Sequence, residues 1–383
     1  MKSGYSFIQT PDSYEAGIIT AEKLKTISPE IVFIFFSIHY SLEEFFEAFY
    51  SIIPEEKVII WGGTGDGVYS PEGVFNNGVC AVGLNSGGKI SCSAAVCDTK
   101  ELSSYNRTEL CMDEVIKKSA GPLKAGLVLS DFVNDGVEIS DGINKKTAAP
   151  FTGALTGDDW LFKKGFVILN GKVYQDAVLI AGLSGDFEYA CNCASGWKPM
   201  GRSGIVNQSE GNIIKYIDNK TAFDFLESEF GFPPKEAELG VISIAVYNDD
   251  GDSFFLRTPS KIDMDTGFIT CFGSIPENSM VRVCNATKQD VTEGAEKCIQ
   301  GLNTANFRPV LGIVISCGGR KWILQDDITK EIEFIKEKFG ADFPFTGFAS
   351  FGEFGPFHLG NGKYTETYFH NVTYSVMIIG EKI

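Results

Sequence analysis

One short pattern occurs three times along the chain, and it constrains the fold more than any other feature. The clearest copies are PFTGALTGDD (Pro150–Asp159) and PFTGFASFGEF (Pro344–Phe354), and a looser copy is VIIWGGTGDG (Val58–Gly67). Each copy is an apolar run that breaks into glycines and then presents an acid. The pattern predicts a buried strand that ends in a loop, where backbone amides are exposed and a carboxylate is held.

Each copy stands inside a longer repeat of helix, strand, helix, strand, Gly-acid loop and strand. The loops end in Gly65-Asp66, Gly157-Asp158 and Gly352-Glu353, at unequal spacings. Unequal spacing indicates internal duplication of an α/β unit rather than a short-period solenoid. We therefore expect an α/β fold with mixed sheets, in which the duplicated units form two packed domains. Residues 1–216 would hold two units, and residues 217–383 a β-rich start followed by the third unit.

Other strands are predicted from apolar runs between turn signals. Ile31–Phe36 is apolar throughout, which is typical of a strand buried on both faces. Two further pairs of runs are each separated by a turn containing Ser-Gly, and each pair predicts a β-hairpin. The pairs are Val79–Leu84 with Ile90–Val96, and Ala177–Leu183 with Phe187–Cys193.

Charge and hydropathy exclude several classes of protein. The net charge of −17 argues against a nucleic-acid partner and against an anionic membrane surface, because both require a basic face. No apolar run approaches the roughly 18 residues of a membrane span, and MKSGYSFIQTPDS contains no signal-peptide segment. We expect a soluble, cytoplasmic protein that does not insert into a membrane.

Metal and cofactor sites are not expected either. The 10 cysteines are scattered like reduced core thiols, and the one close pair, Cys191 and Cys193, has no partner pair at zinc spacing. The chain has 3 histidines, and the acidic stretch Asp249–Asp252 falls short of a calcium loop. The glycines of the first loop match neither a P-loop nor a dinucleotide fingerprint.

The glycine loops and one arginine are the candidates for ligand binding. Freed amides could bind a ligand carboxylate, although glycine could equally serve a tight turn. Arg320 follows Gly318-Gly319 at the end of an apolar run, where a guanidinium suits a carboxylate. Its alternative role is a structural salt bridge to an acid such as Glu353.

Cys317 also invites interpretation as a nucleophile. Such a thiol needs a nearby base, for which His358 and His370 are the candidates in the C-terminal half. The pair His370-Asn371 precedes an alternating strand, where it would more readily cap or orient a loop.

Several segments in order resemble the FIST sensory domain, with its N-terminal and C-terminal parts in sequence. The resemblance runs from about Ile31 to Ile379, and its most specific pieces are Ser316–Arg320, Gly347–Glu353 and His370-Asn371-x-Thr373. The segments are TGDDW, GWKPMGRSGIVNQSEGNIIKYIDNKTAFDFL, VRVCNATKQDV, ISCGGR, PFTGFASFGEFGP and YFHNVTYSV.

The resemblance implies an intracellular, non-enzymatic sensory module that binds a small ligand, such as an amino acid. No kinase, cyclase or F-box-like segment is evident, so we expect the signal to pass to a separate protein. The ligand carboxylate would meet Arg320 and the loop amides, and the ammonium Glu353 or Asp158. The expected binding residues are Gly157, Asp158, Trp197, Cys317, Gly318, Gly319, Arg320, Gly352, Glu353, His370 and Asn371, with Trp160 and Phe351 as further apolar walls.

Two alternatives stay open. One is a protein-interaction adaptor without a small ligand, for which a large exposed apolar patch would be the mark. The other is an enzyme that uses the thiol of Cys317. Because only the third copy has Arg320 upstream and His370-Asn371 downstream, the loop around Gly352-Glu353 is where we expect the site.

Overall fold

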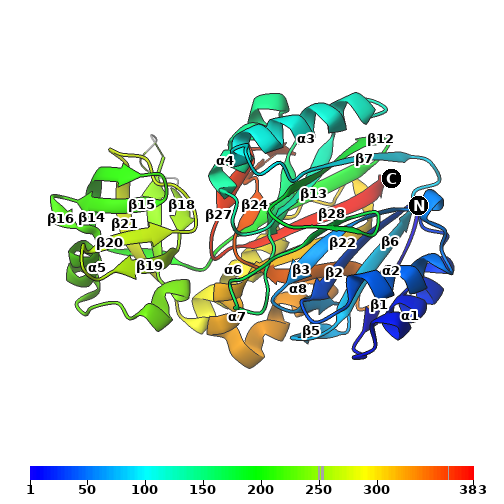
Figure 1. Cartoon of the computed structure of the whole chain (residues 1–383), viewed down its shortest axis with the longest axis horizontal. Coiled ribbons are helices and arrows are strands. Elements are labelled where there is room, and N and C mark those ends of the chain that lie inside the picture. The colour runs from blue at the N-terminus through cyan, green and yellow to red at the C-terminus, as the bar shows by residue number, and fades with distance from the viewer. Residues whose placement is uncertain (249–250, 252–253, 361) are drawn as a thin grey trace.

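Three six-stranded sheets with one shared strand order form the body of the protein (Figure 1). The computed structural model describes residues 1–248, 251, 254–360 and 362–383. Apart from Gly251, the acidic stretch considered above as a calcium loop lies outside these residues. The fold is α/β with mixed sheets, as the sequence predicted.

The three units repeat the same succession of elements. The first comprises α1 (Ser13–Lys25), β2 (Ile31–Ser37), α2 (Leu42–Tyr50), a 3₁₀ turn (Glu55–Lys57), β3 (Ile59–Gly65), β4 (Val68–Ser70), β5 (Gly73–Phe75), β6 (Val79–Asn85) and β7 (Ile90–Cys97), preceded by β1 (Lys2–Ile8). The second comprises α3 (Ser104–Lys118), β8 (Ala125–Ser130), α4 (Gly136–Lys146), β9 (Phe151–Leu155), β10 (Val167–Leu169), β11 (Lys172–Tyr174), β12 (Val178–Gly185) and β13 (Glu188–Ala194). The third comprises α6 (Lys288–Gly301), β22 (Phe307–Cys317), α7 (Gly318–Leu324), a 3₁₀ turn (Gln325–Thr329), α8 (Lys330–Phe339), β23 (Phe345–Ser350), β24 (Glu353–Gly355), β25 (His358–Gly360), β26 (Lys363–Tyr364), β27 (Tyr368–His370) and β28 (Tyr374–Lys382).

The units exchange strands in a cyclic manner. The orders are β1-β6-β2-β3-β10-β11, β7-β12-β8-β9-β24-β27 and β13-β28-β22-β23-β4-β5. In each sheet the two central strands are parallel and their neighbours are antiparallel. The strands that follow each Gly-acid loop join another unit's sheet, and so do β7 and β13, the strands that leave the first and second units. The result is an approximate three-fold arrangement in which β1 occupies the position of a strand leaving the third unit.

Both predicted hairpins are wrong, and the cyclic exchange explains why. Strand β6 pairs with β1 and β2, whereas β7 pairs with β12 in the next sheet. Likewise β12 stays with β8 and β7, whereas β13 pairs with β28. The short turns therefore connect sheets rather than neighbouring strands: β7 and β13 each continue into the sheet of the next unit.

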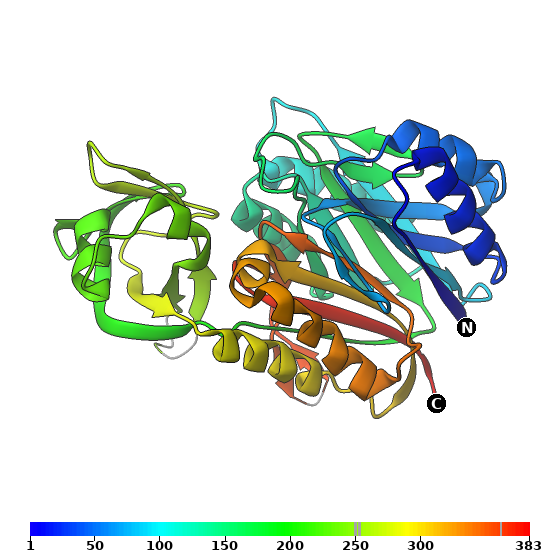
Figure 2. The same ribbon diagram turned by 90° about the horizontal axis from the view of Figure 1, so that it is seen from below.

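The three sheets share one inner core. Side chains from all of them meet there, including Phe35, Trp61, Leu127, Ile313 and Phe348, each fully buried. The outer face of each sheet is covered by the helices of its own unit, α1 and α2, α3 and α4, or α6 and α8 (Figures 1 and 2). Burial on both faces accounts for the continuous apolar runs in the sequence.

One glycine recurs at the same place in all three units for a structural reason. Gly62, Gly153 and Gly347 lie in β3, β9 and β23, opposite a residue of the parallel neighbour. A Cβ on any of them would lie 1.8 Å from that neighbour's carbonyl oxygen. The backbones therefore approach too closely for any side chain, and the recurrence of this glycine is no evidence of a binding loop.

A separate antiparallel sheet interrupts the chain between the second and third units. Its order is β18-β17-β21-β14-β15-β20-β19, and it forms the lobe at the left of Figure 1. Its elements are β14 (Lys198–Glu210), β15 (Ile213–Ile217), β16 (Lys220–Thr221), α5 (Ala222–Phe230), a 3₁₀ turn (Glu236–Val241), β17 (Ser243–Tyr247), β18 (Phe254–Arg257), β19 (Pro259–Asp263), β20 (Phe268–Cys271) and β21 (Met280–Asn285). The expected boundary between residues 216 and 217 falls inside β15, and the division into two domains at that point stays a prediction.

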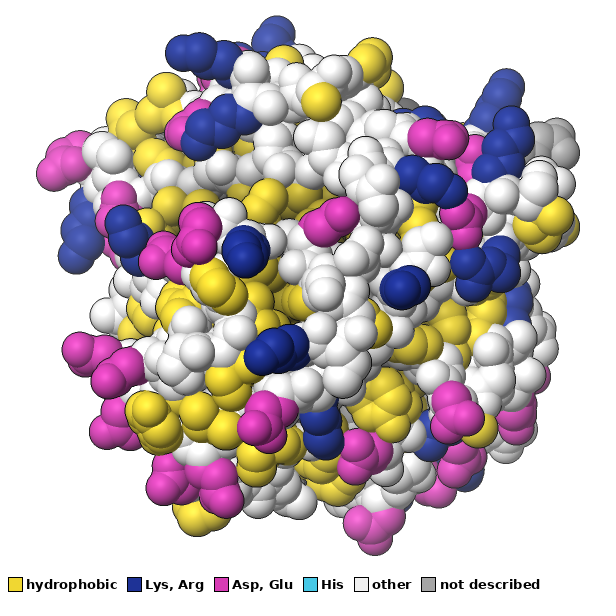
Figure 3. All heavy atoms as spheres, turned by 90° about the vertical axis from the view of Figure 1, so that its right-hand side faces the viewer, with side chains coloured by type: hydrophobic (Ala, Val, Ile, Leu, Met, Phe, Trp, Pro, Cys, Tyr) yellow, Lys and Arg dark blue, Asp and Glu magenta, His cyan; other side chains and the backbone are white. Residues whose placement is uncertain are grey.

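Two surface properties bear on function. On the face drawn in Figure 3, acidic and basic side chains are interspersed, so the net charge of −17 is not gathered there into one acidic field. Among the helices of residues 1–248, 251, 254–360 and 362–383, none is long and apolar enough to cross a lipid bilayer.

Candidate functional site at the ends of the parallel strands

The three Gly-acid loops converge at the centre of the body. The amide of Asp66 donates to the carbonyl of Ala349 at 2.9 Å, and the amide of Gly157 to that of Thr64 at 3.1 Å. The amide of Leu155 donates to the carbonyl of Gly352 at 2.8 Å. Each loop thus touches another, because the strands after each loop pass into a neighbouring sheet. The carboxyl ends of parallel strands are the usual place for a ligand in an α/β fold.

Asp66 is the buried acid at this meeting point. Its side chain is 1% exposed, and its Oδ1 accepts from the amide of Asp159 at 2.6 Å. Its Oδ2 is buried and has no hydrogen-bond partner in the described part of the chain. Burial raises the pKa of Asp66 to about 7, although the nearby Lys321 ammonium opposes this. A carboxyl in this state can hold or release a proton near neutral pH.

Lys321 brings a cation beside Asp66 from the C-terminal unit. It lies on α7, which begins directly after β22, and its Nζ donates to the backbone carbonyl of Asp66. Burial lowers the pKa of Lys321, while Asp66 and Asp159 act in the opposite direction. One hydrogen bond leaves two of the three N–H groups of the ammonium for other acceptors.

Asp158 stabilises the conformation of the second loop. The carboxylate of Asp158 accepts the amides of Phe162, Lys163 and Lys164 at 2.7 to 2.9 Å. Asp159 and Trp160 have φ values of 58° and 62°, in the left-handed region. Such strain in non-glycine residues persists only where the surroundings impose it, and it is enriched at binding sites.

Asp159 extends the charged cluster towards the N-terminal unit. Its Oδ2 lies 2.9 Å from Nε2 of His39, which follows β2. Burial raises the pKa of Asp159, and His39 and Lys321 lower it. His39, Asp66, Asp159 and Lys321 therefore form one chain of contacts across the ends of four strands, β2, β3, β9 and β22.

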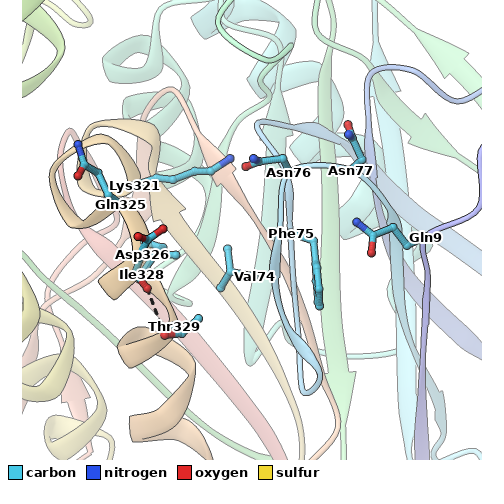
Figure 4. A pocket seen from close by; sticks show the side chains of 10 residues that line it. All are labelled: Gln9, Val74, Phe75, Asn76, Asn77, Lys321, Gln325, Asp326, Ile328 and Thr329. Carbon is cyan, nitrogen blue, oxygen red and sulfur yellow. Dashed lines mark hydrogen bonds between the residues drawn. The ribbon is translucent and has the colours of Figure 1, made fainter.

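Two adjoining cavities open beside this cluster. The larger measures about 620 Å³, and the second, about 480 Å³, shares Gln9 and Asn77 with it and reaches His39. Figure 4 shows Lys321 reaching across the larger cavity towards Asn76, with Gln325 and Asp326 on its own side. We call this pair of cavities the strand-end cleft. Its polar walls combine one cation, one acid and several amides.

Arg320, expected to meet the ligand, is fully buried away from this cleft. Its Nε and Nη2 each lie 2.8 Å from Oε1 of Glu331, and Nη2 also donates to the carbonyl of Val291. Tyr69 donates to the other oxygen of Glu331 at 3.1 Å. The structural salt bridge considered for Arg320 exists, with Glu331 as the acid in place of Glu353.

Glu353 is likewise enclosed. It is 0% exposed; Ser350 donates to its Oε1 at 2.6 Å, and the amide and hydroxyl of Thr373 donate to its Oε2. Burial raises the pKa of Glu353 to about 7. The thiol of Cys317 adjoins it, and burial raises the pKa of that thiol well above its ordinary value. A nucleophilic cysteine needs the opposite shift, so the environment of Cys317 favours an inert thiol.

His370, Asn371 and Trp197, which were also expected to bind the ligand, make hydrogen bonds within the protein. His370 is buried, and its Nε2 lies 3.0 Å from the carbonyl of Gly355 and 3.6 Å from Sγ of Cys193, rather than beside Cys317. The side-chain oxygen of Asn371 accepts the amide of Thr258, which fastens the inserted sheet to the body. Trp197 donates from Nε1 to the carbonyl of Val241 at 2.8 Å.

The expected loop glycines prove to be places of close packing. Gly318 and Gly319 form the first turn of α7 rather than an open loop. A Cβ on Gly319 would lie 2.4 Å from the carbonyl oxygen of Gly240, and one on Gly157 2.7 Å from Oδ1 of Asp66. At Gly352, with φ of 155°, a Cβ would meet the ring of Phe369 at 2.4 Å.

The two aromatic residues expected as walls contact each other, although neither lines the two cavities of the cleft. The rings of Trp160 and Phe351 are 5.8 Å apart, and Phe162 stacks on Phe351 at 4.6 Å. Trp322 of α7 approaches Trp160 at 6.1 Å. Trp160, Leu161, Phe162 and Trp322 are 38 to 58% exposed and together form what we call the aromatic patch.

The four residues of the charged cluster beside the cleft were not among the binding residues expected from the sequence. Lys321 was adjacent to an expected residue, and Asp66 belonged to a recognised loop. His39 and Asp159 carried only a weak signal, a polar residue shortly after an apolar strand. A rule that all residues following parallel strands should be considered together would have found them.

The fold and the cleft define an internally repeated α/β protein with a pocket at the carboxyl ends of its parallel strands. The model of the FIST N domain matches residues 30–220, and that of the FIST C domain matches residues 220–356. The chain therefore belongs to the FIST family. FIST domains are sensory domains, which gives this protein a role in signal transduction.

Individual relatives are distant. The uncharacterized protein MJ1623 of Methanocaldococcus jannaschii is 24% identical over 229 residues, which cover 54% of this chain and 43% of that protein. The match thus spans less than half of the relative's length.

Two solved structures were also matched over 100% of this chain. A cyanuric acid hydrolase from A. caulinodans has a TM-score of 0.38 with 8% identity and 99% of its own chain covered. PurLQS from Thermotoga maritima has a TM-score of 0.22 with 10% identity and 72% covered. Likeness at this level carries no argument about function.

Proposed function

We propose that the protein is a cytoplasmic sensor that binds a free amino acid or a related small carboxylate in the strand-end cleft. The observation that carries this proposal is the position of Lys321, a partly desolvated cation that spans the larger cavity towards Asn76 (Figure 4). The cytoplasmic location is supported by the cysteines, because all ten lie within the described residues and all are free thiols.

The cleft offers complementary groups for both ends of an amino acid. The Lys321 ammonium and the amide of Asn76 suit a carboxylate, and Asp326, which also lines this cavity, suits an ammonium. The glutamine and asparagine side chains can satisfy whichever donors and acceptors remain. This arrangement keeps the ligand class expected from the sequence and assigns it to different residues.

The signal would pass to a separate protein through the aromatic patch. Trp322 lies on the same short helix as Lys321, and Trp160 directly follows Asp159. A ligand that moves Lys321 or Asp159 therefore acts on residues adjacent to the patch. The left-handed loop at Asp159–Phe162 is the element whose conformation such a ligand would shift.

A thermal-shift screen of the full chain against the amino acids and small carboxylates tests ligand binding. A ligand at about 100 times its Kd adds roughly 2.7 kcal/mol to stability, which raises Tm by about 2–4 °C for a protein of this size. Lys321→Met should weaken binding roughly 10- to 100-fold, the effect of losing a charge-assisted hydrogen bond.

Lys117→Met on the exposed face of α3 is the matched control and should bind as the wild type does. Hydrogen exchange across residues 158–164 should change when the ligand is added. A screen without any shift, or a ligand whose binding ignores Lys321→Met, contradicts the proposed site.

The exposure of the aromatic patch favours one second candidate, an adaptor that binds a protein partner without a small ligand. A photo-crosslinking amino acid at position 322 should then capture a partner in the absence of any added ligand, and Leu161→Glu should abolish capture. Ile116→Glu, on another exposed apolar position, is the control. Capture that Leu161→Glu leaves unchanged rules out the patch as the interface.

A further inference from the structure

A second cavity lies between the inserted sheet and the body, away from the strand-end cleft. It measures about 210 Å³. Trp197 closes one side, the inserted sheet contributes Phe254, Phe255 and Leu256, and Phe357 comes from the segment after β24. His370 and Thr373 add polar groups from the body. The cavity contains two residues, Trp197 and His370, that the sequence marked and that the cleft does not use.

The size and lining of this cavity suit a single ring. An apolar cavity of about 150 Å³ holds one benzene molecule, so about 210 Å³ leaves room for a ring with a small substituent. Aromatic side chains dominate the wall, and ring pairs gain stabilisation beyond area burial. A larger cavity of about 1040 Å³ adjoins this one, and Phe255 and Phe357 line both.

The uncharged wall of this cavity favours an uncharged molecule. None of the described side chains on its wall carries a charge at neutral pH, because burial lowers the pKa of His370 to about 4. Burying an unpaired charge there would be strongly unfavourable. A charged amino acid therefore belongs in the cleft and not in this cavity.

His370 also determines which polar group a molecule in this cavity should carry. Its Nε2 lies 3.0 Å from the carbonyl oxygen of Gly355, which can only accept, so the proton of the neutral ring is on Nε2. Nδ1 then carries a lone pair that accepts a hydrogen bond. The ring of Phe357 packs edge-on against this imidazole with centroids 4.9 Å apart. A ring that bears an O–H or N–H group matches these partners.

We propose that this cavity is a second binding site, for a neutral single-ring aromatic molecule that donates a hydrogen bond to His370. The inserted sheet supplies one wall and the body the other, so the bound molecule would contact both. The site is independent of the amino-acid cleft and would stand if that proposal failed.

Isothermal titration of the full chain with phenol, toluene and benzoate tests the site. Phenol should bind roughly two- to tenfold more tightly than toluene, the value of one hydrogen bond. Benzoate should bind at least tenfold more weakly than phenol. Phenol should also shift the indole N–H resonance of Trp197, which donates to Val241 across the same boundary.

Leu256→Phe would fill the cavity and should abolish phenol binding, whereas Leu110→Phe on exposed α3 should leave it unchanged. The three-ligand comparison on the wild type stands even if Leu256→Phe fails to fold. Three results overturn the proposal: no phenol binding at millimolar concentration, benzoate binding as tightly as phenol, or equal affinities for phenol and toluene.

Discussion

Replacing Glu353 by Gln should remove the pH dependence that this residue gives to stability. The carboxyl is fully buried among Ser350, Thr373 and Cys317, and its pKa is raised to about 7 from an ordinary value of 4.5. Glutamine has the same shape, its oxygen can accept from Thr373, and its amide can donate to Ser350 once that hydroxyl rotates. The change removes the ionisation and keeps the packing.

The sign and the size follow from the shift. Because the folded pKa is higher than the unfolded one, the folded chain binds more protons between about pH 4.5 and 7, and stability falls as pH rises through this window. A shift of about 2.5 pKa units at about 1.36 kcal/mol each amounts to roughly 3 kcal/mol. Relative to wild type, Glu353→Gln should therefore gain roughly 3 kcal/mol between pH 4.5 and pH 8.

Urea denaturation of both proteins at half-unit pH steps measures this difference. Asp66 and His370 also titrate, but they contribute equally to both proteins and cancel in the comparison. A difference that stays constant with pH, or that moves in favour of wild type at high pH, refutes the reasoning. It would mean that the three donors around Glu353 outweigh the desolvation of its charge.

Other substitutions test the packing and the buried ion pair. Gly153→Ala should lower the free energy of unfolding by more than about 3 kcal/mol, because its Cβ would lie 1.8 Å from a carbonyl oxygen, whereas Gly88→Ala, with open space around it and φ of 75°, should cost about 1 kcal/mol by the same urea titration. Glu331→Leu should cost about 3–5 kcal/mol by leaving Arg320 unpaired, and Arg320→Met in the same chain should recover most of it. Asp66→Asn should remove a group that titrates near pH 7, which a proton-detected pH titration of the neighbouring Lys321 resonances can follow.

The local elements of the fold could be read from the sequence because they depend on neighbours along the chain. The strand expected at Ile31–Phe36 lies within β2 and is buried on both faces, as its continuous apolar run predicted. The pairing of strands could not be read in this way. Two strands joined by a short turn usually form a hairpin, and β6 and β7 do not, because β6 has β1 and β2 on its two sides and β7 pairs with β12 of the second unit.

For the site too, the sequence indicated the residue types but not their surroundings in the fold. The acids of the three loops are recognisable, but their environments differ. Asp66 keeps a buried, unpaired oxygen, whereas Glu353 accepts hydrogen bonds from Ser350 and Thr373. Nor could the sequence distinguish Glu331 from Glu353 as the partner of Arg320, since both follow it within one unit. In each comparison the role of the acid depends on which residues bury it. Some of those residues come from other units, so they depend on how the units exchange strands.

The attachment of the inserted sheet has a consequence for how the chain can be divided and rebuilt. The strands that enter and leave it are paired, with Lys198 opposite Asn285. A short turn joining Trp197 to Ala286 would therefore excise the lobe without breaking any ladder of the three central sheets. We expect a chain without the lobe to keep the three central sheets, and other lobes could be grafted onto the same pair of strands. Such chimaeras would distinguish ligand binding by the three-sheet body from ligand binding that requires the lobe.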